Sequence, residues 1–267
     1  MGFNQQFNGS GLEPRIITGD ADGDGFLDLI EFDEAGNDEL YFGASTGTFT
    51  RVVGSSMLTP GVRSGVLTSV VGGSHLDVVL SIRGGGLNIM YGVTNGSVPT
   101  PGYRSLVGVP TGTDLSQVIA PLLRGAGGLP TVVLAAGDGS SLYAFDVNNS
   151  NIDDYGRTTV VDPQRIVSAV AAGEFTGEGN LDLVVATRPG TGSFGLPAQL
   201  HVLRGDGDGG LQVVDGGVPG QHGQIDGRAL AVGDLNGDGV DDLVIADTAS
   251  NIVWVVRSAG PGCPLFP

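Results

Sequence analysis

The chain has 267 residues, with 12 basic and 29 acidic side chains, so its formal net charge at pH 7 is −17. Such acidity argues against nucleic acid as a partner, because phosphates need a basic surface. No apolar run approaches the ~20 residues of a membrane-spanning helix, so we expect no membrane insertion. Although Gly and Pro are abundant, 40% of the residues are hydrophobic and come in short dense runs, which favours a folded chain over a disordered one.

The single cysteine, Cys263, excludes an intramolecular disulfide and any metal site built from several cysteines. The first residues of the chain have neither the basic nor the apolar region of a signal peptide. We therefore expect either a cytosolic protein or a secreted domain expressed without its leader.

Five short apolar runs recur at intervals of about 50 residues, which indicates an internal repeat. The runs lie at residues 26–30, 76–80, 129–134, 181–185 and 241–245, and all but the third contain an Asp. An apolar stretch precedes each run, and an alternating segment follows it, at residues 40–42, 87–91, 142–145, 200–203 and 252–256. A fourth segment follows a Gly turn, as at residues 47–53 and 210–214.

Short β-rich runs bounded by Gly, Asn and Asp predict strands joined by tight hairpins, and four strands per repeat predict a propeller blade. The repeats span approximately residues 14–60, 61–110, 111–162, 163–215 and 225–260. We therefore predict an all-β protein in which residues 1–267 form a single five-bladed β-propeller of four-stranded antiparallel blades. The alternative is that the chain forms part of a larger propeller.

The two ends of the chain predict how the ring closes. The last repeat stops after its third strand, and residues 2–7 resemble the start of a fourth strand at residues 47–50. An unpaired edge strand exposes backbone donors and acceptors, which ring closure would satisfy. We therefore predict that residues 1–13 complete the last blade.

Two repeats carry a loop dense in side-chain oxygens between the first two predicted strands. The first loop offers Asp20, Asp22, Asp24, Asp28 and the carbonyl of Phe26, and the second offers Asp234, Asn236, Asp238, Asp242 and the carbonyl of Val240. Clustered carboxylates repel one another, and a hard divalent cation with six to eight oxygen ligands removes the repulsion. The pattern predicts two calcium sites; magnesium is the second choice because it needs a stricter octahedron.

The first loop also has EF-hand spacing, with Glu31 at position 12. An EF-hand needs flanking helices, whereas residues 14–19 and 29–30 have the sequence of strands. We therefore interpret the loop as a strand connection and Glu31 as a solvent-facing strand residue.

A third copy of the loop keeps oxygen side chains at its four ligand positions, Glu174, Thr176, Glu178 and Asp182. Because Glu is longer than Asp and Thr is neutral, we expect a weaker third calcium site at most. The corresponding loops of the second and middle repeats have lost most of these oxygens and predict no metal site.

The loop pattern Asp-x-Asp/Asn-x-Asp-Gly-x-x-Asp, followed by a Leu-Val-Ile run and repeated in β-blades, resembles the FG-GAP/VCBS repeats of integrin α chains and of many secreted proteins. The resemblance implies that the loop joins the first two strands of a blade and that the calcium is structural. It also implies a role in cell adhesion or another extracellular function. The chain departs from the family pattern in three eroded loops and in its predicted number of blades.

Five arginines stand shortly before the predicted first strands, at Arg15, Arg63, Arg104, Arg165 and Arg228. Entry loops of a propeller gather near its axis, so these side chains could form an anion site for an acidic sugar or another carboxylate. The alternative, which we favour, is that each pairs with a nearby Asp or Glu. We expect His201 to be packed or to lie at an edge, and no motif indicates a catalytic nucleophile.

These observations predict a calcium-stabilised, non-enzymatic binding or scaffold domain that is secreted or displayed at the cell surface, with an extracellular protein or glycan as its partner. One alternative is a carbohydrate-binding lectin, for which Tyr41, Tyr103 and Tyr155 are the candidate aromatic platforms. Another is a polysaccharide-active enzyme, which would need an acid–base cluster in one pocket.

Overall fold

The structure is a computed structural model in which a little over half of the chain lies in described strands and turns. It describes residues 15–33, 35–36, 38–52, 61–70, 76–84, 86–90, 102–105, 109, 113, 115–121, 130–136, 139–148, 151–152, 157–175, 178–190, 198–214, 227–248 and 250–257. Every regular element among these residues is a β-strand, as the sequence predicts. None of them forms a helix that could cross a bilayer.

The strands form five sheets, each made from consecutive segments of the chain. The first blade contains β1 (Arg15–Gly19), β2 (Asp28–Phe32), β3 (Asp38–Gly43) and β4 (Phe49–Arg51), and the second contains β5 (Val62–Thr68), β6 (Asp77–Ile82), β7 (Gly86–Met90) and β8 (Gly102–Ser105). The third contains β9 (Leu115–Ile119), β10 (Thr131–Ala136), β11 (Ser141–Asn148), β12 (Asn151–Ile152) and β13 (Arg157–Val160). The fourth contains β14 (Arg165–Gly173), β15 (Asp182–Pro189), β16 (Gln199–Gly205) and β17 (Leu211–Val213), and the fifth contains β18 (Gly227–Gly233), β19 (Asp242–Asp247) and β20 (Ile252–Val256).

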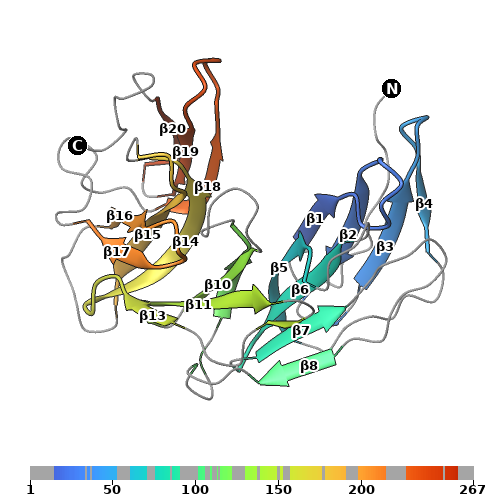
Figure 1. The fold of residues 1–267 in the computed structure, drawn as a ribbon, viewed down its shortest axis with the longest axis horizontal. Helices are drawn as coiled ribbons and strands as arrows, with labels where there is room; N and C mark the ends of the chain where they lie inside the picture. The colour runs from blue at the N-terminus through green and yellow to red at the C-terminus, as the bar shows by residue number, and fades with distance from the viewer. Residues whose placement is uncertain are drawn as a thin grey trace.

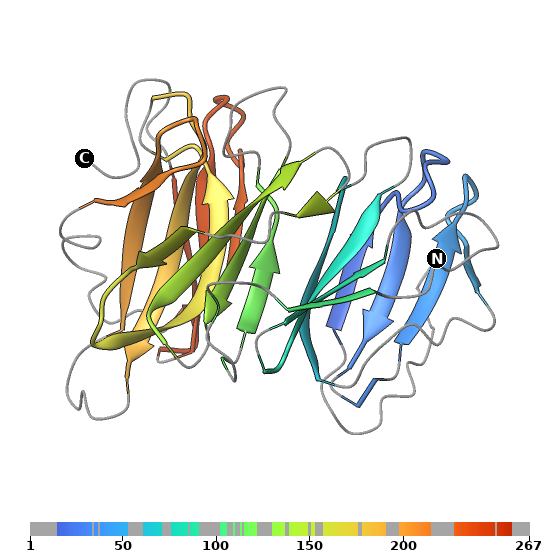
Figure 2. The ribbon, with the colours of Figure 1, turned by 60° about the horizontal axis from the view of Figure 1, so that its bottom comes forward.

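The five blades follow one another around a central space, which confirms the predicted propeller arrangement (Figure 1). The first strands of successive blades are neighbours, so that β5 lies between β1 and β9, and β14 lies between β9 and β18. Figure 2 shows the sheets standing side by side. Because strand order is the same in each blade, the loops between first and second strands emerge at one end.

Apolar side chains on both faces of each inner sheet hold neighbouring blades together. In the fourth blade, Leu183 and Val185 pack with Val133 of the third blade. The intervening Val184 and Ala186 point to the opposite face and pack with the fifth blade. Side chains alternate along a strand, so a strand buried on both faces must be apolar throughout. Each fully buried Val or Leu contributes about 1.5–3 kcal/mol to this packing.

Two blades depart from the predicted four strands. The third sheet has a fifth strand, because β11 is long enough for its end to pair with the two-residue β12 while its start pairs with β13. The fifth sheet has three described strands, in the order β18-β19-β20. Residues 1–13, which we predict to supply its fourth strand, lie outside the described residues, so this closure stays a prediction.

A β-bulge occurs at the same level of the first strand in four blades. The paired residues skip from Val62 to Ser64 in β5 and from Gly227 to Ala229 in β18. The corresponding irregularities in β9 and β14 leave Ser116 and Ser168 without a partner opposite them. A bulge bends its strand and turns the extra residue away from the regular alternation. The bulges therefore set which side chains the first strands present to the central space.

The face of the fifth sheet turned away from the fourth blade is apolar and exposed. It carries Val253 and Val255 of β20, whose exposed fractions are 64% and 49%, together with Ala229 and Ala231 of β18. The opposite face of the same sheet, with Leu243 and Ile245, is fully buried against the fourth blade. Among the described residues, nothing covers the exposed face, which is therefore open to a further layer.

Replacing Phe3 and Phe7 together by Ser tests the predicted closing strand. If residues 1–13 pair with β20, these two side chains share one face of the added strand, and we expect their removal to lower the free energy of unfolding by about 3 kcal/mol. Asn4→Ser, on the other face, is the matched control. Equal urea midpoints for the double variant and the control would contradict closure by this segment.

Candidate metal centre

The first acidic loop connects two strands, β1 and β2, so an EF-hand is excluded as the sequence predicts. Gly23 and Gly25 have φ values of 79° and 91°, a region that favours glycine. Their amides donate to the two carboxylate oxygens of Asp20, at 2.8 Å and 2.9 Å. The glycines thus let the loop wrap around the Asp20 carboxylate.

Asp28, at the start of β2, binds backbone amides of the same loop. Its side chain is fully buried. The Oδ2 atom accepts the amides of Ala21 at 2.7 Å and Asp22 at 3.3 Å, and Oδ1 accepts the amide of Gly43 at 2.9 Å. One carboxylate therefore joins the loop to the end of the third strand.

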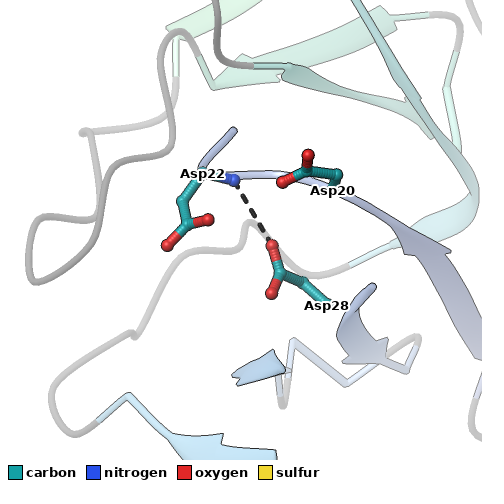
Figure 3. A group of neighbouring side chains, drawn as sticks. All are labelled: Asp20, Asp22 and Asp28. Atoms are coloured by element: carbon teal, nitrogen blue, oxygen red, sulfur yellow. Dashed lines mark hydrogen bonds between the residues drawn. The ribbon is translucent and has the colours of Figure 1, made fainter. Parts of the chain in front are cut away.

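Three of the predicted ligands of the first loop come together. Asp20, Asp22 and Asp28 each place one carboxylate oxygen within 4.8 Å of the others (Figure 3). Asp24 is not part of this group; its Oδ1 accepts the amide of Phe26 at 2.9 Å. Asp22 and Asp28 are buried, whereas Asp20 is partly exposed, so the group opens toward solvent on one side.

Burial and mutual repulsion act on two of these carboxyls. Burial raises the pKa of Asp22 above its ordinary value, and the neighbouring Asp28, Asp24 and Asp20 raise it further. Burial likewise raises the pKa of Asp28, while the amides that it accepts oppose the shift. A bound divalent cation would offset both effects by supplying opposite charge to the group.

The second acidic loop, between β18 and β19, repeats this hydrogen-bond pattern at equivalent positions. Asp234 accepts the amides of Gly237 at 2.7 Å and Gly239 at 2.8 Å, and Asp242 accepts that of Leu235 at 2.9 Å. The backbone amides hold the pKa of Asp234 below its ordinary value. The two loops thus have the same local geometry despite their different side chains.

Position 3 distinguishes the second loop from the first. It is Asn236, whose Nδ2 donates to Asp238 Oδ2 at 2.9 Å and whose Oδ1 accepts the Asp238 amide. Only two carboxylates, Asp234 and Asp242, therefore stand at the positions that form the group of three in the first loop. The second loop offers a less negatively charged set of oxygens.

The third loop uses its acidic side chains differently. Glu174 Oε1 accepts the amide of Glu178 at 3.1 Å, and the Glu178 carboxylate pairs with Arg204 at 3.4 Å. Thr176, another predicted ligand, lies outside the described residues. Because Glu178 already faces an arginine, this loop has less negative charge available for a cation than the first.

A buried Asp at the start of the second strand is common to four blades, at Asp28, Asp77, Asp182 and Asp242, and each has no exposed surface. Each accepts the amide of the residue seven positions earlier, as Asp77 does from Val70 at 2.6 Å. Our sequence reasoning treated this Asp only as a metal ligand and missed its structural role. The second repeat carried the signal, since it keeps this Asp although its loop has lost most of the other oxygens.

The third strand ends close to this buried Asp in two blades. Gly205 donates its amide to Asp182 Oδ1 at 3.0 Å, as Gly43 does to Asp28. A Cβ atom at Gly205 would lie 2.1 Å from the carbonyl oxygen of Leu181, and one at Gly43 would lie 2.0 Å from that of Leu27. Only glycine allows the strand to come near enough for this hydrogen bond.

Two residues interpreted from the sequence as exposed are buried. Glu31 is 9% exposed, because it lies between Ile16 and Glu39 on neighbouring strands and not on a free face; burial raises its pKa.

Tyr41 is 4% exposed and donates its hydroxyl hydrogen to Glu39, so it is not an aromatic platform for a sugar. Burial, reinforced by this bond, raises the pKa of Tyr41 to about 12. The side chain of Tyr103 and all of Tyr155 lie outside the described residues.

The arginines that precede the first strands have different environments in the structure. Arg165 is buried and pairs with Asp162 at 2.9 Å, as the pairing alternative predicts. Arg15 and Arg63 instead line a central cavity of about 740 Å³ between the first strands of all five blades. The side chains of Arg104 and Arg228 lie outside the described residues.

His201 is buried within the fourth blade, where its Nε2 lies 3.0 Å from Thr187 Oγ1. This packed position is one of the two that the sequence predicts. Burial lowers the pKa of His201 below its ordinary value, and the nearby Arg165 lowers it further. The imidazole is therefore a neutral packing and hydrogen-bonding group of the blade.

Comparison with protein families matches residues 174–245 to the model of the FG-GAP-like repeat. The match begins directly after β14, so it covers the third acidic loop and the last three strands of the fourth blade, and it continues through the second acidic loop into β19. This is the resemblance that the loop pattern predicts, found here over about a quarter of the chain. A comparison with curated protein sequences finds no match.

Solved structures with the same fold have low sequence identity to the chain. A putative 6-phosphogluconolactonase from Bacteroides fragilis matches with a TM-score of 0.60 and 13% identity, over 86% of this chain and 63% of that one. An exotype rhamnogalacturonan lyase matches with a TM-score of 0.50 and 16% identity, over 94% of this chain and 48% of that one. A structure of BBS1N in complex with ARL6DN gives a TM-score of 0.52 and 13% identity, over 94% and 84%. The chain thus spans about three-fifths and one-half of the first two proteins, and the likeness establishes the fold alone.

Replacing Asp182 by Asn tests the structural role of the buried carboxylate. The amide keeps the shape of the side chain but turns an NH₂ group toward one of the backbone N–H groups of Phe175 and Gly205. We expect a loss of about 1–3 kcal/mol in the free energy of unfolding, measured in urea with EDTA present. Asp208→Asn, in an exposed hairpin, is the control and should be neutral; equal stability of the two variants would refute the role.

The lowered pKa of His201 makes stability depend on pH. The neutral imidazole contributes stability above the unfolded-state pKa of about 6.5. This contribution is lost as the pH falls below that value toward the lower folded-state pKa, because the unfolded chain then binds the proton more readily. In EDTA, between pH 7.5 and pH 5, we expect the wild type to lose more unfolding free energy than His201→Gln. Parallel losses would show that His201 does not contribute.

Proposed function

We propose that the chain is a calcium-stabilised, non-enzymatic binding or scaffold domain that works outside the cell or at its surface. The observation that carries the proposal is the first acidic loop, in which oxygens of Asp20, Asp22 and Asp28 lie within 4.8 Å of one another. The match of residues 174–245 to the FG-GAP-like repeat supports the general class of binding or scaffold propeller.

The donor set fits a calcium ion. Calcium accepts six to eight oxygen ligands from carboxylates, carbonyls and water in flexible geometry, and a loop of acidic side chains supplies such donors. Asp20, Asp22 and Asp28 would hold the ion at the first loop, with Asp24 and the Phe26 carbonyl as the further predicted ligands. At the second loop these roles fall to Asp234, Asn236, Asp238, Asp242 and the Val240 carbonyl. The bound ion would supply positive charge that neutralises the carboxylates.

An extracellular setting follows from the weakness expected of such sites. Extracellular modules bind calcium with dissociation constants of about 10⁻⁴–10⁻³ M, which suits the millimolar calcium found outside cells. Both loops are partly exposed, and the second has one carboxylate fewer than the first, so we place both sites in this affinity range. An extracellular protein or glycan is the proposed partner.

A lectin and a polysaccharide-active enzyme are the alternative functions. The burial of Tyr41 removes one of the sugar platforms that a lectin would use. The described lining of the central cavity contains no Asp, Glu, His or Tyr, which supports a binding role there over acid–base catalysis. The similarity to a lactonase and a lyase extends to the fold and carries no activity to this chain.

Calcium should raise the thermal midpoint of the wild-type protein above its value in EDTA. By mass action, a free calcium concentration of 100 times the dissociation constant adds about 2.7 kcal/mol for each site. Asp20→Asn and Asp234→Asn should each remove one site, so titration calorimetry should give two ions for the wild type and one for either variant. Asp208→Asn should keep both ions.

The same experiment shows how the calcium proposal would fail. An unchanged midpoint in calcium and EDTA for the wild type would remove structural calcium from the proposal. An equal number of bound ions in Asp20→Asn, Asp234→Asn and the wild type would show that calcium binds elsewhere. Magnesium at equal concentration should raise the midpoint less, because it needs near-octahedral ligands.

A further inference from the structure

The central cavity has basic side chains in its described lining, although the chain as a whole is strongly acidic. The chain carries a net charge of −17, yet the described lining residues include Arg15 and Arg63 and no carboxylate. Both arginines stand on first strands, β1 and β5, which are neighbours in the ring. An anion that enters the cavity therefore meets two guanidinium groups away from the acidic loops.

The bulges on the first strands explain why polar residues occur here among apolar strands. Arg63 and Ser116 occupy bulge positions, and both line the cavity, as does the bulged Ser168 of the fourth blade. Ser64, Gln117 and Ala169, which directly follow these bulges, also line the cavity. The bulge thus adds a polar side chain to the lining of the cavity.

Some polar groups of the lining already bind neighbouring blades. Gln117 donates through Nε2 to the carbonyl of Val170 and accepts the Val170 amide, both at 2.9 Å. Ser168 donates to the carbonyl of Gly227 at 2.7 Å. These side chains join the third blade to the fourth and the fourth to the fifth, so we do not assign them to a ligand.

Ser64 and Arg15 remain available to a ligand. Ser64 Oγ accepts the amide of Val118 at 3.2 Å, and its hydroxyl hydrogen has no acceptor among the described residues. Arg15 is half-buried and makes no ion pair with a described residue. Arg15 on β1 and Arg63 on β5 offer donors from neighbouring strands, and Ser64 offers its hydroxyl on the side of β5 that faces β9.

We propose that the central cavity binds a small organic anion of the sugar-acid class, with its carboxylate held by Arg15 and Arg63 and by the hydroxyl of Ser64. Guanidinium groups bind carboxylates through paired, charge-assisted hydrogen bonds. The volume of about 740 Å³ is within the range of ligand pockets and admits a sugar ring. Ile16 and Leu230 offer apolar contacts to the carbon face of the ring. The inference names a ligand for the proposed binding domain but does not depend on calcium.

Calorimetric titration of the calcium-loaded protein with D-glucuronate and D-glucose tests the proposal, since the two sugars differ in one carboxylate. We expect one glucuronate per chain and at least tenfold weaker binding of glucose. Arg15→Gln and Arg63→Gln should each weaken glucuronate binding about tenfold, the usual cost of a lost charged hydrogen bond. Added sodium chloride should also weaken it. Arg204→Gln, which removes an exposed arginine outside the cavity, should bind as the wild type does.

The outcomes separate this proposal from the others. Equal affinity for the two sugars, or undiminished glucuronate binding by Arg15→Gln, would overturn the proposal. The melting curve of Arg63→Gln shows whether that variant is folded. If it is not folded, the result for Arg15→Gln alone tests the proposal. Binding of inorganic sulfate or phosphate without glucuronate would overturn the assignment of an organic ligand. Glucuronate binding that persists in EDTA while the calcium midpoint shift is absent would support the cavity and reject structural calcium.

Discussion

A buried carboxylate at the start of the second strand is the constraint on which each blade with an acidic loop depends. Asp28 accepts amides from the loop before it and from Gly43 at the end of the third strand. One side chain therefore joins the loop of the first hairpin to the third strand. Asp182 repeats the arrangement with Phe175 and Gly205. Because buried amides without acceptors are costly, the loop has little freedom once this Asp is in place. The candidate metal ligands are therefore positioned by an interaction that needs no metal.

The acidic loops and the two arginines of the cavity occupy different parts of the molecule. Its acidic loops lie at the ends of the blades, where water and cations reach them, whereas Arg15 and Arg63 line the centre. The two regions have different structural origins. The loop depends on glycines with positive φ, such as Gly23, whereas Arg63 lines the cavity from a bulge in β5 and Arg15 from the regular strand β1. A change in one region can therefore leave the other intact.

Repeats and periodicity were sufficient to predict the blades, and local loop chemistry predicted four carboxylate ligands in the first loop, of which Asp20, Asp22 and Asp28 come together. The sequence was insufficient where the environment comes from distant segments. Glu31 has the spacing of an exposed strand residue, and only its neighbours across β1 and β3 bury it. The sequence left open whether Arg63 lies near the axis or pairs with an acidic residue, and it gives no sign of the bulge from which Arg63 lines the central cavity. Asp24 has ligand spacing, but it lies outside the group of three carboxylates, and its Oδ1 accepts the Phe26 amide.

The exposed apolar face of the fifth blade affects how copies of the protein behave toward one another. Val253 and Val255 offer a surface like the one that the fourth blade buries, and β20 has no described strand beyond it. At neutral pH the negative charge of the chain keeps such surfaces apart through long-range repulsion. As acid protonates the carboxylates, that repulsion weakens while the apolar face is unchanged. Colloidal stability and conformational stability thus draw on the same acidic side chains, and acidification weakens the first without requiring any blade to unfold.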